Sequence, residues 1–406
     1  MARAREACGN VPVLATPGRL TAIAEAEDLL ARGVADVIGV ARGVIAEPQL
    51  VNNALYGRES ESRTCIAANH CSPYNPGHGC ALNPTVAKEE RWGVRQNAKA
   101  PRSMRVVVVG GGPSGMEAAR VAAMRGHTVT LIERRARLGG ALALVARMPG
   151  REHMHRAGDW WAHQLDRLGV EVRTATDADA ETILALAPDA VMVATGALYA
   201  REGMSGFSAQ PIPGWDQPFV LTPDEVLSGA RTASGQLLII DEEGRNAGVG
   251  TAEFLAAHGC RVTIVSSYDS AAPHMGTARH YIGLRLREAG VLLSLGTRVL
   301  AIGDCEVKLE LLATGEQRTV PVDGVIMSTM RRQVDGLIDM LTGKVAYIYQ
   351  IGDALAPRSL IEATYEGHKF ARLLGEDVMP KTVIDELFRI APGFRPAETL
   401  TAIDAA

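Results

Sequence analysis

The sequence predicts an α/β protein in which helices connect the strands of parallel sheets. In residues 104–140 an apolar run leads into a glycine-rich turn, and a helical pattern and a second strand follow. Residues 237–265 repeat this order of strand, helix and strand, and a later strand ends at Gly352-Asp353 before another helix. These three observations predict two nested Rossmann-like folds, with the second inserted into the first.

The composition is typical of a soluble globular protein. The 406 residues are enough for two or three domains, and 47% of them are hydrophobic and 22% charged. The net charge of −4 gives no sign of a nucleic-acid partner, and no apolar run reaches the length of a membrane span. The first residues lead into no signal-peptide core. We therefore expect a cytoplasmic protein with neither nucleic acid nor membrane as a partner.

The glycine-rich turn has the spacing G-x-G-x-x-G and lies between a strand and a helix, the context that dinucleotide binding requires. Gly110 permits the tight turn, Gly112 lets the backbone approach a pyrophosphate, and Gly115 lets the helix pack closely on the strand. The next strand ends at Glu133, where a carboxylate would bind the ribose hydroxyls. The alternative is a glycine-rich turn that binds nothing, but the complete context favours a dinucleotide.

Two β-α units are predicted before this fold. A strand at 11–15 ends before Gly18-Arg19, a helix is expected over 21–32, and a strand at 37–40 ends before Ala41-Arg42. Small residues and arginines after two successive strands suit a phosphate held by backbone N–H groups and guanidinium groups. The alternative is that both arginines are solvated loop charges.

Three cysteines follow in a loop rich in Gly, Pro and Asn. Cys65, Cys71 and Cys80 have the spacing C-x5-C-x8-C. Close thiolates in such a loop suit an iron–sulfur cluster or zinc, and the alternative is free cysteines in a structural loop. The isolated cysteines are expected to be buried small apolar residues: Cys8, Cys260 and Cys305.

These patterns resemble the iron–sulfur flavoproteins of the old yellow enzyme, trimethylamine dehydrogenase and 2,4-dienoyl-CoA reductase family. The resemblance is closest to the branch of trimethylamine dehydrogenase and the N-methylproline and dimethylglycine demethylases. It implies that residues 1–60 are a TIM-barrel fragment, the last two β-α units, in which Gly18, Arg19, Ala41 and Arg42 hold the FMN phosphate. The first six barrel strands are absent, and so small a piece cannot close a sheet. We therefore expect a second subunit that supplies the rest of the barrel and shares the FMN.

The resemblance also gives the cysteine-rich loop a role. The family pattern is C-x2-C-x2/3-C with a more distant fourth cysteine, and it binds a [4Fe-4S] cluster. Cys65, Cys71 and Cys80 match the first, third and fourth cysteines, whereas Ala68 stands at the second. A fourth ligand is left open among His70, His78 and solvent, and a three-iron cluster is the other possibility.

For the first dinucleotide fold, the resemblance implies bound FAD, or ADP as in trimethylamine dehydrogenase. The turn after strand 190–194 and the Gly-Asp pair before helix 359–374 are then the closing elements of the nucleotide fold. The fingerprint and the resemblance together assign the nucleotide site to Gly110, Gly112, Ser114, Gly115, Glu133, Arg134, Gly140, Thr195, Gly196, Gly352 and Asp353.

The second fold departs from the fingerprint at its turn. After strand 237–240 the chain reads Asp241-Glu242-Glu243, so three carboxylates stand where a pyrophosphate would need backbone N–H groups. Because negative charges repel phosphate and the glycine geometry is lost, the sequence argues against NAD(P)H in this degenerate, NAD-like domain.

The favoured function is the electron-transfer subunit of a flavin-dependent amine dehydrogenase or oxidative N-demethylase. Electrons would pass from FMN through an iron–sulfur cluster to an external acceptor such as an electron-transferring flavoprotein. The alternatives are an NAD(P)H-dependent enoate reductase of the 2,4-dienoyl-CoA reductase kind and a non-catalytic nucleotide-binding subunit. No catalytic residue is assigned. The expected domains are the barrel fragment at 1–60, the cysteine loop and linker at 61–100, the FAD/ADP domain at 101–215 plus 346–385, the second fold at 216–345 and a tail at 386–406.

Overall fold

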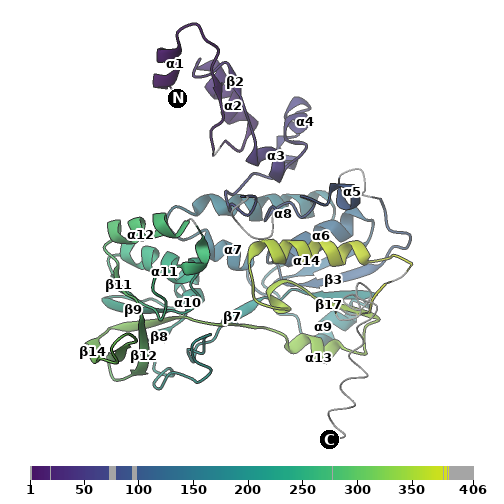
Figure 1. Ribbon diagram of the computed structural model, residues 1–406. Coiled ribbons are helices and arrows are strands. Elements are labelled where there is room, and N and C mark those ends of the chain that lie inside the picture. Colours follow the sequence, from purple (N-terminus) through teal and green to yellow (C-terminus); the bar gives the residue numbers. More distant parts are fainter. Residues whose placement is uncertain are drawn as a thin grey trace, which may run out of the picture. The chain divides into compact units, whose positions relative to one another are not determined.

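The structure is a computed structural model that describes residues 2–18, 20–72, 79–93, 98–276, 278–377, 379–381 and 383. The chain forms two compact units. Unit 1 comprises Met1–Gly139, Arg156–Gly196 and Asp335–Ala406, and unit 2 comprises Gly140–His155 and Ala197–Val334. Both are α/β units with parallel sheets (Figure 1), which confirms the predicted fold class at this level.

The parallel sheet of unit 1 has the strand order β17-β6-β3-β4-β5. Its strands are β3 (Arg105–Val109), β4 (Thr128–Ile132), β5 (Glu171–Arg173), β6 (Ala190–Val193) and β17 (Tyr347–Gln350). In the central strand β3, Val106 pairs with Val129 of β4 and with Ala190 of β6. All of β3 after its first residue is buried, as expected for an apolar strand that is covered on both faces.

Helices cover both faces of this sheet (Figure 1). They are α6 (Pro113–Met124), α8 (His155–Arg167), α9 (Ala180–Ala185), α13 (Gly336–Leu341) and α14 (Leu360–Leu373). On one face, Ile183 of α9 and Leu341 of α13 join Val107 of β3 in a single apolar core. β17, which follows the strands of unit 2 in the sequence, pairs in parallel with β6, so the chain returns to the first sheet as the sequence predicts.

α6 and α14 pack closely against each other because small residues line their contact. A Cβ atom on Gly367 of α14 would lie 2.3 Å from the carbonyl oxygen of Ser114, and Ala118 and Ala122 of α6 are fully buried. α14 begins where the sequence predicts, after Ser359, whose hydroxyl forms a capping box with Glu362. This crossing places the start of α6 beside the element that follows β17.

The first sixty residues contain a short β-α-β unit. Its elements, with the neighbouring helices, are α1 (Ala2–Cys8), β1 (Leu14–Ala15), α2 (Ile23–Ala31), β2 (Val37–Ile38), α3 (Arg42–Ala46), α4 (Leu50–Leu55), η1 (Glu59–Glu61) and the later α5 (Glu89–Trp92). The predicted strands are shorter than expected, since each has two residues, and Leu14 pairs in parallel with Val37. Leu14 is 64% exposed and Val37 is 50% exposed. A two-stranded sheet with exposed apolar residues is not a complete core.

Unit 2 contains the second parallel sheet, with the order β11-β10-β9-β15-β8. Its strands are β8 (Val220–Leu221), β9 (Gln236–Asp241), β10 (Arg261–Val265), β11 (Leu292–Ser294) and β15 (Gly324–Ser328). Its helices are α7 (Gly140–Val145), α10 (Pro223–Ser228), α11 (Asn246–Ala257) and α12 (Ala278–Glu288). The helix expected between the two strands of residues 237–265 is α11, which begins at Asn246.

Two antiparallel sheets of unit 2 were not predicted. One consists of β12 (Thr297–Ile302), β13 (Glu306–Leu311) and β14 (Gln317–Pro321), and the other pairs β7 (Ala197–Tyr199) with β16 (Arg331–Gln333). The first carries its apolar residues at alternate positions, with Val307 and Leu309 buried in the unit 2 core. In the second, Arg331–Gln333 follow β15 in the sequence and pair in antiparallel with β7.

The expectation that the isolated cysteines are buried is wrong. Cys8 and Cys305 are exposed, and Cys260 is only partly buried. Cys305 lies in the turn between β12 and β13, with a φ of +55°, and is exposed there.

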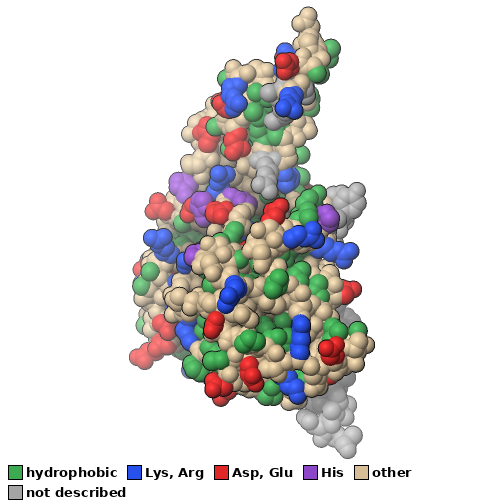
Figure 2. Space-filling model, turned by 90° about the vertical axis from the view of Figure 1, so that its left-hand side faces the viewer, with side chains coloured by type: hydrophobic (Ala, Val, Ile, Leu, Met, Phe, Trp, Pro, Cys, Tyr) green, Lys and Arg blue, Asp and Glu red, His purple; other side chains and the backbone are tan. Residues whose placement is uncertain are grey.

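The surface mixes charges of both signs. Figure 2 shows acidic and basic side chains interspersed on the face that it presents, as the totals of 46 acidic and 42 basic residues lead one to expect. Among the residues that the structure describes, no helix has the length and apolar character needed to cross a membrane.

Candidate functional site

The glycine-rich turn after β3 is packed so tightly that only glycine fits at two of its positions. Gly110 has a φ of +113°, and a Cβ atom there would lie 2.2 Å from the carbonyl oxygen of Ala194. A Cβ atom on Gly115 would lie 1.9 Å from the carbonyl oxygen of Gly110. The turn therefore has the tight bend and the close helix–strand packing of a dinucleotide-binding turn, and Gly112 is the residue that precedes α6.

Glu133 follows β4 and reaches back to this turn. Its carboxylate is buried, with Oε2 accepting the Gly111 N–H at 2.6 Å and Oε1 accepting the Arg135 N–H at 2.8 Å. These two bonds fix the carboxylate at the edge of the turn, where a ribose would present its hydroxyls. Arg134 follows directly in sequence, and Gly140 is the first residue of α7 in unit 2.

The residues that follow β17 lie beside the glycine-rich turn of the first fold. Gly352 has a φ of +65°, and a Cβ atom there would lie 2.7 Å from the Cβ atom of Ser114. Asp353 lies in the short helix η5 (Gly352–Ala354), and its Oδ1 accepts the Arg358 N–H at 2.9 Å. Thr195 and Gly196 follow β6 after one residue, Ala194. The structure thus brings Gly352 to the start of α6, although the two are far apart in sequence.

A dinucleotide fits this edge of the sheet. The Ser114 hydroxyl is buried and has no hydrogen-bond partner, so it is a polar group that still needs one. It lies in the first turn of α6, where the helix dipole favours a phosphate. The backbone of Gly112 and the carboxylate of Glu133 would hold the pyrophosphate and the ribose of FAD or ADP here.

Glu117 of α6 lies at the centre of a buried polar cluster that the sequence analysis missed. Its carboxylate accepts hydrogen bonds from Arg120 (2.7 and 2.9 Å), from Trp161 Nε1 (2.9 Å) and from His368 Nδ1 (2.8 Å). Burial by itself would raise the pKa of Glu117, but Arg120 and the other donors hold this pKa well below its usual range. A charged pair three residues apart in a helix of small apolar residues was the available signal.

His368 should make the stability of unit 1 fall in mild acid. Burial lowers the pKa of His368 despite the neighbouring Glu117, and Arg120 and Arg372 also disfavour its charged form. The unfolded imidazole, with a pKa of about 6.5, takes up a proton first, so the folded state loses stability as the pH falls below about 6.5. Urea denaturation of wild type and His368→Gln between pH 7.5 and 5.5 should show a weaker pH dependence in the variant. Equal slopes for both would contradict this, and His163→Gln on the exposed face of α8 is the control.

The polar cluster continues to the cysteine loop through stacked arginines. The guanidinium groups of Arg120 and Arg63 lie 5.4 and 4.9 Å from the centre of the same Trp160 ring. Arg63 also pairs with Glu47 at 3.4 Å, and both of these side chains are almost fully buried. Arg63 stands two residues before Cys65, so α6 and α8 are joined to the start of the cysteine loop.

The three cysteines line one small cavity together with Arg42 and His70. Cys65 Sγ accepts the Ala67 N–H at 3.4 Å, and Cys80 Sγ accepts the Leu82 N–H at 3.5 Å. Burial raises the pKa of the Cys80 thiol. Three thiols in one cavity, two of which accept backbone N–H groups, are the donor chemistry of an iron–sulfur group. Across the described residues, however, no three His, Cys, Asp or Glu side chains are placed to hold a metal ion. Ala68 lines the same cavity, and His78 lies outside the described residues.

The candidate phosphate residues near the N-terminus also come together. A Cβ atom on Gly18 would lie 3.2 Å from Arg42 Nη2, and Ala41 is the residue that precedes α3. Arg42 Nη1 donates a hydrogen bond to Asn69 Oδ1 at 2.9 Å, so this arginine contacts the cysteine loop. Arg19 lies outside the described residues.

The three carboxylates at the end of β9 and directly after it in unit 2 have three different environments. Asp241 faces α11, where a Cβ atom on Gly248 would lie 2.5 Å from its carboxyl carbon, and burial raises the pKa of Asp241 to about 7. Glu242 Oε1 accepts the N–H (3.2 Å) and the hydroxyl (2.8 Å) of Ser267. Glu243 pairs with Arg331 at 3.2 Å and accepts the Tyr199 hydroxyl at 3.2 Å. No G-x-G-x-x-G turn is present at this position.

The two sheets and the intact first turn define an oxidoreductase-type dinucleotide fold. The chain belongs to the pyridine nucleotide-disulphide oxidoreductase family, whose match covers residues 62–182 and 104–367.

Among curated proteins, the chain is 34% identical to an NADH oxidase of Thermoanaerobacter brockii, over 89% of this chain and 55% of that protein. It is 35% identical to a probable N-methylproline demethylase of Rhizobium meliloti, over 62% of this chain and 36% of that protein. A solved structure of 6-hydroxypseudooxynicotine amine oxidase from Pseudomonas geniculata N1 matches with a TM-score of 0.84 and 30% identity, covering 90% of this chain and 57% of that one. These relatives confirm the predicted resemblance. The chain spans about half the length of the NADH oxidase and the amine oxidase.

Proposed function

We propose that this chain is the electron-transfer part of a flavin-dependent amine dehydrogenase or oxidative N-demethylase. The observation that carries the proposal is the contrast between the two folds. The turn of the first fold keeps every glycine that a nucleotide needs. The turn of the second fold lacks these glycines and contains Glu242, which is hydrogen-bonded to Ser267. A fold that keeps FAD or ADP but not a nicotinamide nucleotide suits an enzyme that takes its electrons from an organic substrate. The similarity to an N-methyl demethylase and an amine oxidase supports amines as that substrate class.

Within this proposal, FAD or ADP binds at the first fold and FMN binds near Gly18, Ala41 and Arg42. When bound, the flavin would accept a hydride from a substrate C–H and a cluster at the cysteines would pass electrons on singly, to an acceptor such as an electron-transferring flavoprotein. The chain's own contribution is to bind and orient. Arg42, which lies beside Gly18 and donates to Asn69, ties the FMN phosphate region to the cysteine loop.

The cysteine site is tested by its iron content. We expect Cys71→Ser to lower the iron and acid-labile sulfide of the purified protein by at least half, because one of three thiol ligands is lost. Cys260→Ser is the matched control, since Cys260 lies in unit 2 and bonds only weakly to the Ala233 carbonyl. Equal iron in both variants, or zinc in the wild type, would show that the thiols are structural or hold another metal.

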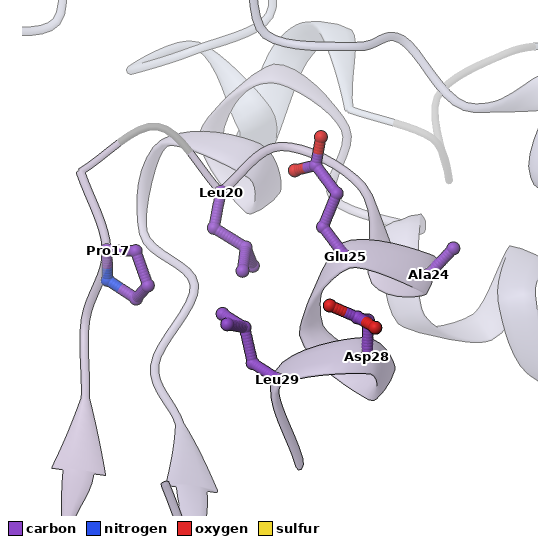
Figure 3. A pocket seen from close by; sticks show the side chains of 6 residues that line it. All are labelled: Pro17, Leu20, Ala24, Glu25, Asp28 and Leu29. Carbon is purple, nitrogen blue, oxygen red and sulfur yellow. The ribbon is translucent and has the colours of Figure 1, made fainter. Parts of the chain in front are cut away.

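We propose that a second subunit supplies the rest of the barrel and completes the FMN site. Figure 3 shows Leu20 and Leu29 pointing toward each other in a surface pocket beside Pro17. The exposed Leu14 and Val37 lie on the adjoining strand pair. Apolar surface and open strand edges of this kind are normally covered.

Expressed alone, the chain should self-associate and lack FMN, while it keeps FAD or ADP. Analytical ultracentrifugation and nucleotide analysis of the purified chain measure both properties. A monomer with stoichiometric FMN would contradict the proposed subunit.

We also propose a cytoplasmic location, because a reducing compartment suits the free cysteines.

Anaerobic reduction of the flavin tests the function as a whole. With the native complex, an N-methylated amine should bleach the flavin absorbance, and NADH at the same concentration should not. The second candidate, an NAD(P)H-dependent enoate reductase, is supported by the similarity to an NADH oxidase and predicts the reverse pattern. A colourless protein that carries ADP alone would indicate a non-catalytic subunit.

A further inference from the structure

Each of the two nucleotide folds has a carboxylate that hydrogen-bonds between the turn and the end of the second strand. The carboxylate comes from the strand end in the first fold and from the turn in the second. In the first fold a carboxylate follows the second strand, and Glu133 reaches back to the Gly111 N–H of the turn. In the second fold the carboxylate belongs to the turn, and Glu242 reaches forward to Ser267, two residues after β10. In both cases the carboxylate joins the turn to the end of the neighbouring strand. In the second fold, however, Glu242 stands at the position that Gly111 has in the first, and the residue directly after β10, which matches Glu133, is Ser266.

Aromatic side chains from the next loop cover the same turn. A Cβ atom on Gly244 would lie 2.9 Å from the Tyr268 ring and 3.0 Å from the rings of Pro273 and His274. The Tyr268 hydroxyl and His274 Nε2 are 3.0 Å apart, and the His274 N–H donates to the Gly244 carbonyl at 3.1 Å. The loop is therefore tied to the turn by hydrogen bonds as well as by packing.

The neighbouring acids do not join the turn to Ser267. Asp241 points under α11, and Glu243 is held by Arg331 and Tyr199 of the β7–β16 pair. Among the three, Glu242 alone bonds to the strand end through its side chain, since Asp241 accepts the Ser266 hydroxyl with its backbone carbonyl (2.6 Å). The second oxygen of Glu242, Oε2, is buried without a hydrogen-bond partner. The three carboxylates, which the sequence analysis treated alike, are thus different in role.

We propose that Glu242 is the specificity-determining residue that closes the nucleotide site of the second turn and excludes NADH and NADPH. In the first fold a Cβ atom at the matching position, Gly111, would lie 3.1 Å from the Glu133 carboxylate, so a side chain at this position takes up the space beside the ribose ligand. The Glu242 carboxylate, held there by Ser267, also places a negative charge at the turn where the pyrophosphate would lie. The inference deepens the proposed function, on which it rests for the choice of electron source. It concerns binding, so it is tested separately from the reaction.

The test is equilibrium dialysis of NADH against the holoprotein, with the first fold saturated by its own nucleotide. We expect Glu242→Ala to bind NADH roughly tenfold or more tightly than wild type, a change of about 1.4 kcal/mol or more. Glu242→Gln keeps an acceptor for Ser267, so its NADH affinity should stay near the wild-type value. Glu288→Gln removes an equal charge from the exposed end of α12 and should also match wild type.

Wild type that binds NADH as tightly as Glu242→Ala would overturn the proposal, and so would Glu242→Ala that binds no better than Glu288→Gln. If Glu242→Gln binds as tightly as Glu242→Ala, charge alone excludes the nucleotide and closure by the Ser267 bond is wrong. Thermal melting identifies a variant that has lost its fold, in which case Glu242→Ser replaces Glu242→Ala. Failure of amines to reduce the flavin, with NADH still excluded, would contradict the proposed function and leave this inference standing.

Discussion

Glu117→Gln is expected to lower the free energy of unfolding by about 3–5 kcal/mol, the usual cost of removing one partner of a buried ion pair. The carboxylate is fully buried and accepts four hydrogen bonds that join α6, α8 and α14. A glutamine amide keeps the shape but cannot accept all four, and it leaves the buried Arg120 guanidinium without its ion-pair partner. Urea denaturation followed by circular dichroism measures the change.

The control for this prediction is an exposed ion pair in the same unit. Asp28 and Arg32 are four residues apart on α2, and both side chains are about 60% exposed. Asp28→Asn should therefore change the free energy of unfolding by no more than about 0.5 kcal/mol. If Glu117→Gln were as mild as Asp28→Asn, the buried cluster would not stabilise the crossing of these helices.

Gly112→Val should remove the nucleotide from the first fold, with a loss of affinity of roughly a hundredfold or more, or about 2.7 kcal/mol. Gly112 directly precedes α6, where the backbone must meet the pyrophosphate, and a branched side chain there would separate the two. Glu133→Ala should have a smaller effect, because it removes the ribose contact and leaves the turn in place. Nucleotide released from the denatured protein and measured by chromatography gives the stoichiometry of each variant.

Gly158→Val is the matched control, since Gly158 lies in α8 and a Cβ atom there would have no neighbour within 4 Å. It should retain full nucleotide occupancy. Undiminished nucleotide in Gly112→Val would show that the turn is not the binding site. Loss of nucleotide in both valine variants would instead point to a general loss of folding.

The order of strands and helices was determined by local sequence patterns, because periodicity and capping act over a few residues. The second strand of the first fold, Thr128–Ile132, ends next to Glu133 as predicted, and α14 begins after Ser359 as expected. The glycine spacing also predicted the tight turn, since Gly110 and Gly115 have backbone neighbours that exclude any side chain. The sheet β12–β14 was missed, since its short amphipathic strands carry a weaker pattern than the parallel ones.

Contacts between distant residues were decided only by the tertiary structure. His368 meets Glu117 across 251 positions, and the sequence contains no feature that pairs them. Arg42 turns toward Asn69, and Glu242, not its neighbours, bonds to Ser267, because helix crossings and loop paths set where each side chain points. The exposure of a side chain also depends on the tertiary structure: Cys305 is exposed because it lies in the turn between β12 and β13. The sequence by itself determined the two folds and the turn that suits a nucleotide. The partner of each buried charge depended on packing, which joins elements without regard to their separation along the chain.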